Sequence, residues 1–298
     1  MRDGQQWQTI RRLEQSVLTA VFLPLALGII MLGLGLSLTV ADFRRVVVYP
    51  RAVIVGLTSQ MLILPPVCFG IARLFNLPPE FAVGLMLLAA SPGGATANLF
   101  SHLAKGDVAL NITLTAVNSV LTLFTLPFIV NFALVAFMGA GKVIPLQFGK
   151  VMQVFAIVLV PVCLGMLVRR YKQAAALRLE RPVRIVSALL LVVIVFAAIA
   201  KERHQLIEMM QLVGGAALVF NLTSMCVGYF VPRLMRLPKP QAVAIGMEIG
   251  IHNSTLAITI ASTPALLGNP KMAIPPAIYS LIMFFTAAVF GALVNRRK

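Results

Sequence analysis

Nine long apolar runs, separated by short polar connections, make up most of this 298-residue chain. A helix that crosses a membrane needs about 20 apolar residues. This length predicts spans near residues 17–39, 51–75, 80–103, 108–138, 147–169, 183–201, 209–232, 240–262 and 272–294. Residues 1–15 are polar with scattered apolar positions, a pattern compatible with a short interfacial helix. The sequence therefore predicts an all-α polytopic membrane protein with about nine transmembrane helices, built as one transmembrane domain.

The longest polar connection, residues 169–184, divides the runs into two halves. This layout predicts a first repeat at about 17–140 and a second at about 147–295. Each half contains one interrupted run, with the sequence SPGGATANLF at 91–100 and GMEIGIHNST at 246–255. Lipid offers no hydrogen bonds, so irregular backbone at that depth persists only against protein or a water-filled cavity. Paired interruptions of this kind indicate the binding site of a transporter.

Composition excludes a soluble domain, because 59% of the residues are hydrophobic and only 11% are charged, against about 25% charged in soluble domains. The formal net charge is +16, but the basic residues form short clusters between apolar runs. That pattern is typical of cytoplasmic anchoring and not of nucleic-acid binding. Placing the N-terminus outside and the C-terminus in the cytoplasm puts sixteen of the 25 Lys and Arg residues inside. We therefore expect this orientation in a plasma or inner membrane.

The first interruption combines a proline with two glycines. Pro92 removes a backbone donor, and Gly93 and Gly94 permit backbone shapes that other residues resist. The residues that follow can restart a half-helix whose free N–H groups attract an anion. Thr96 and Asn98 supply side-chain oxygens nearby. The alternative is a kinked but continuous helix that packs through its small residues.

The second interruption carries Glu248, the only acidic residue of its run. A carboxylate in mid-membrane costs at least a few kcal/mol, which makes it a functional-site hypothesis by default. His252, Asn253 and Ser254 follow it. Unwound backbone here would expose carbonyls, and carbonyls with one carboxylate suit a hard cation. The alternative is a structural carboxylate, neutralised by a proton or by a partner such as His252.

Other runs add polar side chains. Asn111 and Thr115 share one helix face in the fourth run, and Gln60 interrupts the second. Interhelical hydrogen bonds worth roughly 0.6 to 2 kcal/mol each would explain these residues without function. Asn221 belongs to a similar set in the seventh run, and we assign it no role. Asp42 is interpreted as a helix cap. No set of residues indicates an enzyme, since no nucleophile or metal ligand accompanies the carboxylate.

At this level of detail the sequence resembles a known family. The stretch SPGGATANLFSHLAKGDVALNITLTAVNS is similar to the first signature of the bile acid:sodium symporter family. EIGIHNSTLA is similar to its second, commonly E-x-G-x-QN-(S/A)-x-L, and the likeness extends from about residue 17 onward. The resemblance implies an inverted-repeat transporter with panel and core domains and two crossing broken helices. It resembles bacterial members of the family, in the nine-span form that lacks the first helix.

The resemblance also implies two sodium sites. The first would use Asn98, Asn111, Thr115 and Glu248. The second would use Gln60, Glu248, the carbonyls of Ile249 and Ile251, and His252. The substrate would lie near the crossing, formed by Pro92, Gly93, Gly94, Thr96, Asn98, Asn253 and Ser254.

Three positions depart from the family pattern. Ala97 and Asn111 stand where serine is usual, and His252 replaces the usual glutamine. Sodium prefers oxygen ligands, whereas imidazole nitrogen suits softer metals. Histidine also titrates near neutral pH, so a proton could repel or replace a cation. The hypothesis is that the second site is weakened or linked to protons.

These observations predict a sodium-coupled symporter that imports an organic anion by alternating access. The substrate is expected to be bile-acid-like or a small carboxylate such as pantoate. Two alternatives stay open: a proton- or sodium-linked antiporter or efflux carrier of the same fold, and a non-transporting membrane sensor. The expected partners are the anion and the lipid bilayer, with no nucleic acid, and the sequence does not specify an oligomeric state.

Overall fold

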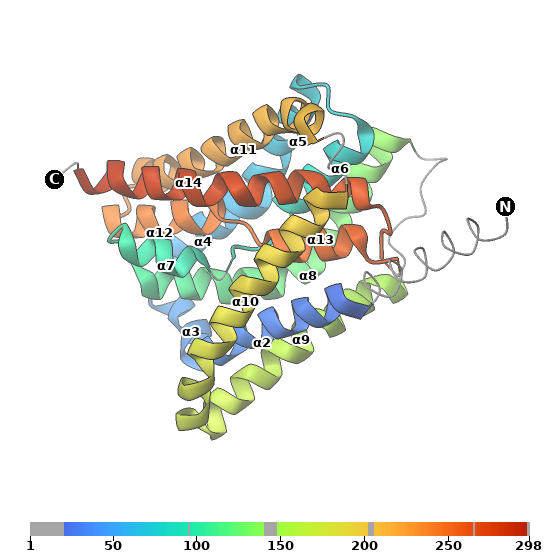
Figure 1. The fold of residues 1–298 in the computed structure, drawn as a ribbon. Helices are drawn as coiled ribbons and strands as arrows, with labels where there is room; N and C mark the ends of the chain where they lie inside the picture. Colours follow the sequence, from blue (N-terminus) through green and yellow to red (C-terminus); the bar gives the residue numbers. More distant parts are fainter. Residues whose placement is uncertain (1–20, 95, 140–147, 202–205, 265, 297–298) are drawn as a thin grey trace.

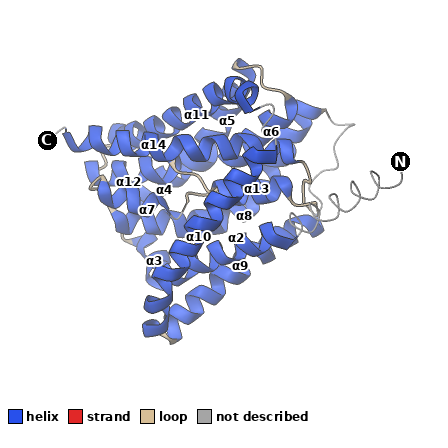
Figure 2. Ribbon diagram, in the orientation of Figure 1, coloured by secondary structure: helices blue, strands red, loops and turns tan. Residues whose placement is uncertain are grey.

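The computed structural model describes residues 21–94, 96–139, 148–201, 206–264 and 266–296, and these form helices joined by short connections (Figures 1 and 2). In the first half the helices are α2 (Leu23–Ser37), α3 (Val40–Arg44), η2 (Arg45–Val47), α4 (Pro50–Thr58), η3 (Ser59–Ile63), α5 (Leu64–Leu74), α6 (Pro79–Ala89), α7 (Thr96–Leu103) and α8 (Val108–Met138). In the second half they are α9 (Phe148–Tyr171), α10 (Gln173–Lys201), α11 (Leu206–Leu234), α12 (Lys239–Gly250), α13 (Ser254–Ser262), η5 (Pro270–Ala273) and α14 (Ile274–Arg296).

Each of the nine predicted runs contains a helix or a series of short helices. Among the described residues, four helices are long and apolar enough to cross a membrane, and the bent pair formed by α2 with α3 and η2 would be a fifth. Large apolar side chains such as Phe128 and Phe285 are 77% and 74% exposed, which suits a surface that faces lipid and not water. The protein is therefore an all-α polytopic membrane protein. The interfacial helix predicted for residues 1–15 lies outside the described residues.

The helices form two groups. Helices α2, α9 and α10 pack mainly on one another, and the remaining helices form a second, larger bundle (Figure 1). Gly35 and Gly165 allow α2 and α9 to approach closely, because a Cβ at either position would collide with the backbone of the other helix. Small residues at such contacts are a common basis of helix packing in membranes. The two groups correspond to the panel and core that the resemblance implies.

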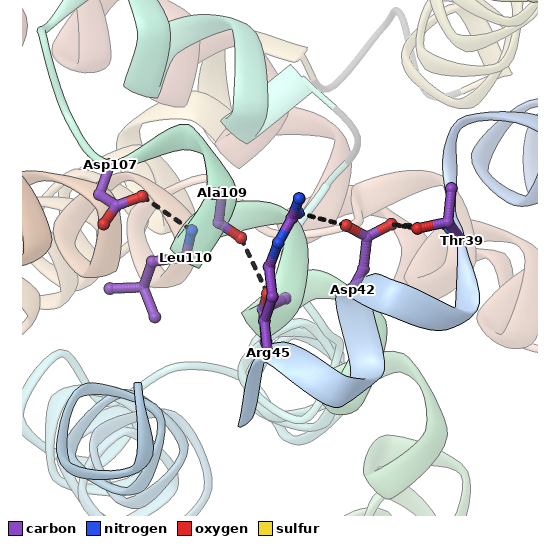
Figure 3. Close-up of polar contacts among 7 residues, drawn as sticks. Thr39, Asp42, Arg45, Asp107, Ala109 and Leu110 are labelled. Carbon is purple, nitrogen blue, oxygen red and sulfur yellow. Dashed lines mark hydrogen bonds and ion pairs between the residues drawn. The ribbon is translucent and has the colours of Figure 1, made fainter. Parts of the chain in front are cut away.

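Polar side chains hold the bend between α2 and α3, which turns the chain by 72°. The Asp42 carboxylate accepts hydrogen bonds from the backbone N–H and the hydroxyl of Thr39, each at 2.7 Å, and pairs with Arg45 (Figure 3). The predicted cap at Asp42 is thus confirmed. Asp107 caps α8 in the same view by accepting from the N–H of Leu110 at 3.0 Å. These caps satisfy helix ends that the bends expose.

Two turns of the same geometry precede the two interrupted spans. Asn76 and Arg236 both adopt left-handed backbone conformations, with φ of 48° and 60°. The next residue in each turn, Leu77 or Leu237, is buried and donates its N–H to a carbonyl five residues earlier. The residue after it, Pro78 or Pro238, occupies the N-cap position of α6 or α12. The equivalent positions lie 160 residues apart.

Candidate cation and substrate site

The two interruptions break their helices fully and meet each other. The N–H of Gly94 donates to the carbonyl of Ile251 at 2.7 Å, and the N–H of Asn253 donates to the carbonyl of Pro92 at 2.8 Å. Gly93 and His252 form the resulting antiparallel bridge. Each break thus supplies hydrogen-bond partners for the other, as irregular backbone at this depth requires. This excludes the alternative of a kinked, continuous helix, since α6 ends at Ala89 and α7 begins at Thr96.

The glycines of the first break are explained by close approach. A Cβ at position 93 would collide with the carboxylate of Glu248. At position 94 it would lie 3.3 Å from the carbonyl oxygen of His252, which is tighter than ordinary contact. The first break therefore contributes backbone, and its lack of side chains leaves room for the carboxylate of the second break.

The residues predicted for the first sodium site come from three packed helices. Glu248 on α12 is 1% exposed and accepts a hydrogen bond at Oε2 from the hydroxyl of Thr115 on α8, at 2.6 Å. Asn111, one turn earlier on α8, donates through Nδ2 to the carbonyl of Ala244 at 2.7 Å. Asn98 belongs to α7, which packs against both α8 and α12.

Three buried oxygens of this group have no hydrogen-bond partner among the described residues: Asn98 Oδ1, Asn111 Oδ1 and Glu248 Oε1. Buried polar atoms are normally paired, so orphaned ones call for an explanation. Two amide oxygens and a carboxylate oxygen are the ligands that a hard cation prefers. The group therefore fits a sodium ion.

Two of the residues predicted for the second sodium site, Gln60 and His252, lie beside each other. The second span widens into the π-helical turn η3 just before Pro65 and Pro66, which lack backbone donors. Gln60 in this turn is 3% exposed and donates through Nε2 to the carbonyl of Ser91 at 3.0 Å. His252 Nδ1 lies 3.3 Å from the same carbonyl and 3.4 Å from Gln60 Nε2.

The two carbonyl-bearing residues of this site have different surroundings. Ile249 lies in the last turn of α12, and its side chain packs close to Gly228 on α11. Ile251 lies in the break itself, where its carbonyl accepts the N–H of Gly94. One of the two carbonyls is therefore already hydrogen-bonded across the crossing.

A polar network that the sequence did not indicate holds the end of α12. The carbonyl of Gly250 accepts hydrogen bonds from Asn221 Nδ2 and from the hydroxyl of Tyr279, each at 2.9 Å. Thr286 in turn bonds to Asn221 Oδ1. Asn221, assigned no role from the sequence, thus fixes the second break from behind. The sequence signal for Asn221 was a polar amide in the middle of an apolar run. Tyr279 gave no such signal, because an aromatic residue in an apolar run is common in a packed core.

A narrow crevice lies between the crossing and the α2–α9–α10 group. Its lining includes Pro92 and Asn253 from the two breaks, Ser119 and Thr122 from α8, Met31 from α2 and Val158 from α9. The half-helices α7 and α13 begin at the same crossing, at Thr96 and Ser254. Helix N-termini carry partial positive charge. The Ser254 hydroxyl is buried and has no hydrogen-bond partner within the described ranges. Asn253 caps α13 by accepting from the N–H of Leu256 at 3.0 Å.

Comparison with known proteins identifies the family. A family model described as the sodium bile acid symporter family matches residues 11–209. The chain belongs to this family. It is 30% identical over 261 residues to an uncharacterized sodium-dependent transporter, YocS, of Bacillus subtilis, an alignment that covers 87% of this chain and 78% of the relative.

Two further relatives show the breadth of the family. The ileal sodium/bile acid cotransporter of Oryctolagus cuniculus is 24% identical, with 95% of this chain and 82% of the relative aligned. The probable sodium/metabolite cotransporter BASS1 of Arabidopsis thaliana, a chloroplast protein, is 26% identical. That alignment covers 91% of this chain but 66% of the relative. Membership confirms the predicted family, the sodium-dependent transport class and the prediction that the chain is not an enzyme.

Proposed function

We propose that this protein imports an organic anion together with sodium by alternating access. The observation that carries the proposal is the group of unpaired oxygens around Glu248, buried where two broken helices pair. Sodium is held by Asn98, Asn111, Thr115 and Glu248. The anion binds beside the N-termini of α7 and α13 when the crevice, which is narrow in this structure, widens. Bile-acid-like anions and small carboxylates such as pantoate are the substrate classes to test.

Electrostatics accounts for the coupling. An ionised Glu248 repels an anion strongly in surroundings of low dielectric constant. Bound sodium neutralises the carboxylate and draws the Asn98 and Asn111 amides toward it, which fixes the half-helix N-termini for the substrate. By thermodynamic linkage, sodium then raises substrate affinity by the same factor by which substrate raises sodium affinity.

Alternating access follows from the division into two helix groups. Movement of the α2–α9–α10 group against the larger bundle opens the crevice first to one side and then to the other. The matching turns at Asn76 and Arg236 support a fold of two repeats, at about 17–140 and 147–295. The basic clusters support a cytoplasmic C-terminus and an external N-terminus.

Uptake into proteoliposomes tests this function. Radiolabelled taurocholate and pantoate are supplied under an inward sodium gradient, with potassium in place of sodium as the reference. Glu248→Ala is expected to abolish sodium-driven uptake. Glu180→Ala is the matched control, because Glu180 lies in α10, outside both broken spans, and 3.8 Å from Arg169. Both proteins should reconstitute equally.

The same preparation separates the alternatives. Uptake driven by opposed sodium and proton gradients would indicate an antiporter, and export under an outward substrate gradient with no sodium dependence would indicate an efflux carrier. Absence of any gradient-dependent flux with a wide panel of anions would favour a sensor. Sodium-driven uptake at the wild-type rate in Glu248→Ala would contradict the proposed site.

A further inference from the structure

The surroundings of His252 are those of a packed core side chain. Its ring stacks on Phe220, with centroids 5.6 Å apart and planes at 15°, and meets Tyr279 edge-on at 5.5 Å. The residue is 1% exposed. Two aromatic rings and the crossing therefore hold the imidazole in one position, and the family resemblance assigns residue 252 to the ligands of the second sodium site.

The hydrogen-bond geometry around His252 does not fit a cation. If Nδ1 carries the proton, it donates to the Ser91 carbonyl, which can only accept. If Nδ1 is bare, its lone pair faces the amide donor of Gln60. Nδ1 is occupied by a protein partner in either tautomer. Nε2 is buried with no hydrogen-bond partner in the described part of the chain, on a ring flanked by Phe220 and Tyr279. It is also a nitrogen, whereas sodium prefers oxygen ligands.

The buried negative charge at the crossing comes from one residue. In the described part of the chain the buried acidic residues are Asp42 and Glu248, and Asp42 is already paired with Arg45 at the α2–α3 bend. Glu248 is thus the carboxylate available at the crossing. Both predicted sodium sites would share this carboxylate, so the side chain at position 252 decides whether a second ion can bind.

We propose that His252 takes the place of the second sodium, so that the transporter binds and couples a single sodium ion. This inference rests on the proposed function and specifies its stoichiometry. The imidazole links η3 to both breaks through Gln60 and Ser91, the connection that a cation would otherwise make. That part of the crossing is therefore assembled before sodium arrives, and sodium completes only the site around Glu248.

Equilibrium binding of radioactive sodium to the purified protein in detergent tests the stoichiometry without any substrate. Wild type should bind one sodium per chain, with choline as the background ion. Glu248→Ala should bind none. His252→Gln restores an amide oxygen and should bind two. Gln60→Leu removes the buried Oε1, which has no hydrogen-bond partner among the described residues. This variant should still bind one ion, because the single site lies around Glu248.

The outcomes are distinguishable. Two sodium ions bound to wild type would overturn the inference and leave the proposed function intact. No sodium bound to wild type would contradict the proposed function itself. If His252→Gln folds and still binds one ion, the loss of the second site is not due to His252, which also overturns the inference. If His252→Gln does not fold, loss of sodium binding in Gln60→Leu remains the overturning result. One ion in both wild type and Gln60→Leu supports the inference.

Discussion

The two interrupted spans meet at one crossing but contribute different chemical groups to it. The first break consists of backbone, with Pro92, Gly93 and Gly94 and no ionisable side chain. The second brings the carboxylate of Glu248 and the imidazole of His252. The difference is a steric necessity, because the carboxylate occupies the space that a side chain at position 93 would fill. One break without ionisable side chains and one break with them thus form a single site. Two breaks that both carried large side chains could not pack together in this way.

The largest effect is expected from a substitution that adds a side chain to the first break, beside the Glu248 carboxylate. Gly93→Ala places a methyl group against the Glu248 carboxylate. We expect sodium-driven uptake to fall by at least about 100-fold, and the free energy of unfolding to fall by about 1–3 kcal/mol, the usual cost of overpacking. Uptake and thermal unfolding of the same preparation measure both effects.

Gly70→Ala is the matched control for this substitution. A Cβ at position 70 has no atom within 4 Å, so uptake and stability should remain near the wild-type values. Gly93→Ala with wild-type uptake would show that the carboxylate does not need the space left by the first break.

A smaller effect is expected when the group around Glu248 loses one oxygen ligand. Asn111→Ala removes an unpaired oxygen and the hydrogen bond to the Ala244 carbonyl. The sodium concentration for half-maximal uptake should rise about tenfold, with a smaller rise for Asn111→Ser, which keeps an oxygen. Asn295→Ala is the control, because Asn295 lies at the exposed end of α14. Equal sodium dependence in Asn111→Ala and wild type would remove Asn111 from the site.

The support behind the second break can be tested separately. Tyr279→Phe removes one of the two donors to the Gly250 carbonyl while Asn221 keeps the other. We expect a loss of about 1 kcal/mol in the free energy of unfolding, the net worth of a typical hydrogen bond, and at most a threefold loss of uptake. Tyr229→Phe, whose ring packs against Phe230 and Phe290, is the comparison. Thermal unfolding in detergent would show whether the two substitutions differ.

Much of the fold and part of the site could be predicted from the sequence, for physical reasons. The length of a long apolar run is enough to predict a membrane helix. Pro92 and the two glycines after it predict a break, because proline lacks a backbone donor and glycine permits non-helical backbone conformations. Glu248 stands out because charge is costly in lipid. These signals are local. That the two breaks pair, and that Gly93 faces Glu248, depends on how remote helices pack, and only the family resemblance predicted the crossing.

Contacts made by residues with no distinctive sequence signal could not be predicted. Tyr279 and Phe220 read as core residues, and nothing local places them around His252. The π-helical turn that carries Gln60 depends on the prolines after it, whose effect on helix geometry is not specific enough to predict. Asn221 was visible as an amide in an apolar run, but its partner, the Gly250 carbonyl, is 29 residues away on another helix.

The smallest expected effect concerns the turns that precede the two broken spans. Arg236 and Asn76 hold left-handed conformations, which glycine adopts at no steric cost and asparagine tolerates better than arginine. Arg236→Gly should therefore raise the free energy of unfolding by up to about 1 kcal/mol, and Asn76→Gly by less. Arg236→Ala is the control, because it removes the same charge but keeps the strained backbone and should not stabilise. Thermal unfolding distinguishes the three variants. If Arg236→Gly and Arg236→Ala shift the midpoint equally, charge and not backbone geometry governs this turn, and the likeness between the two turns has no energetic basis.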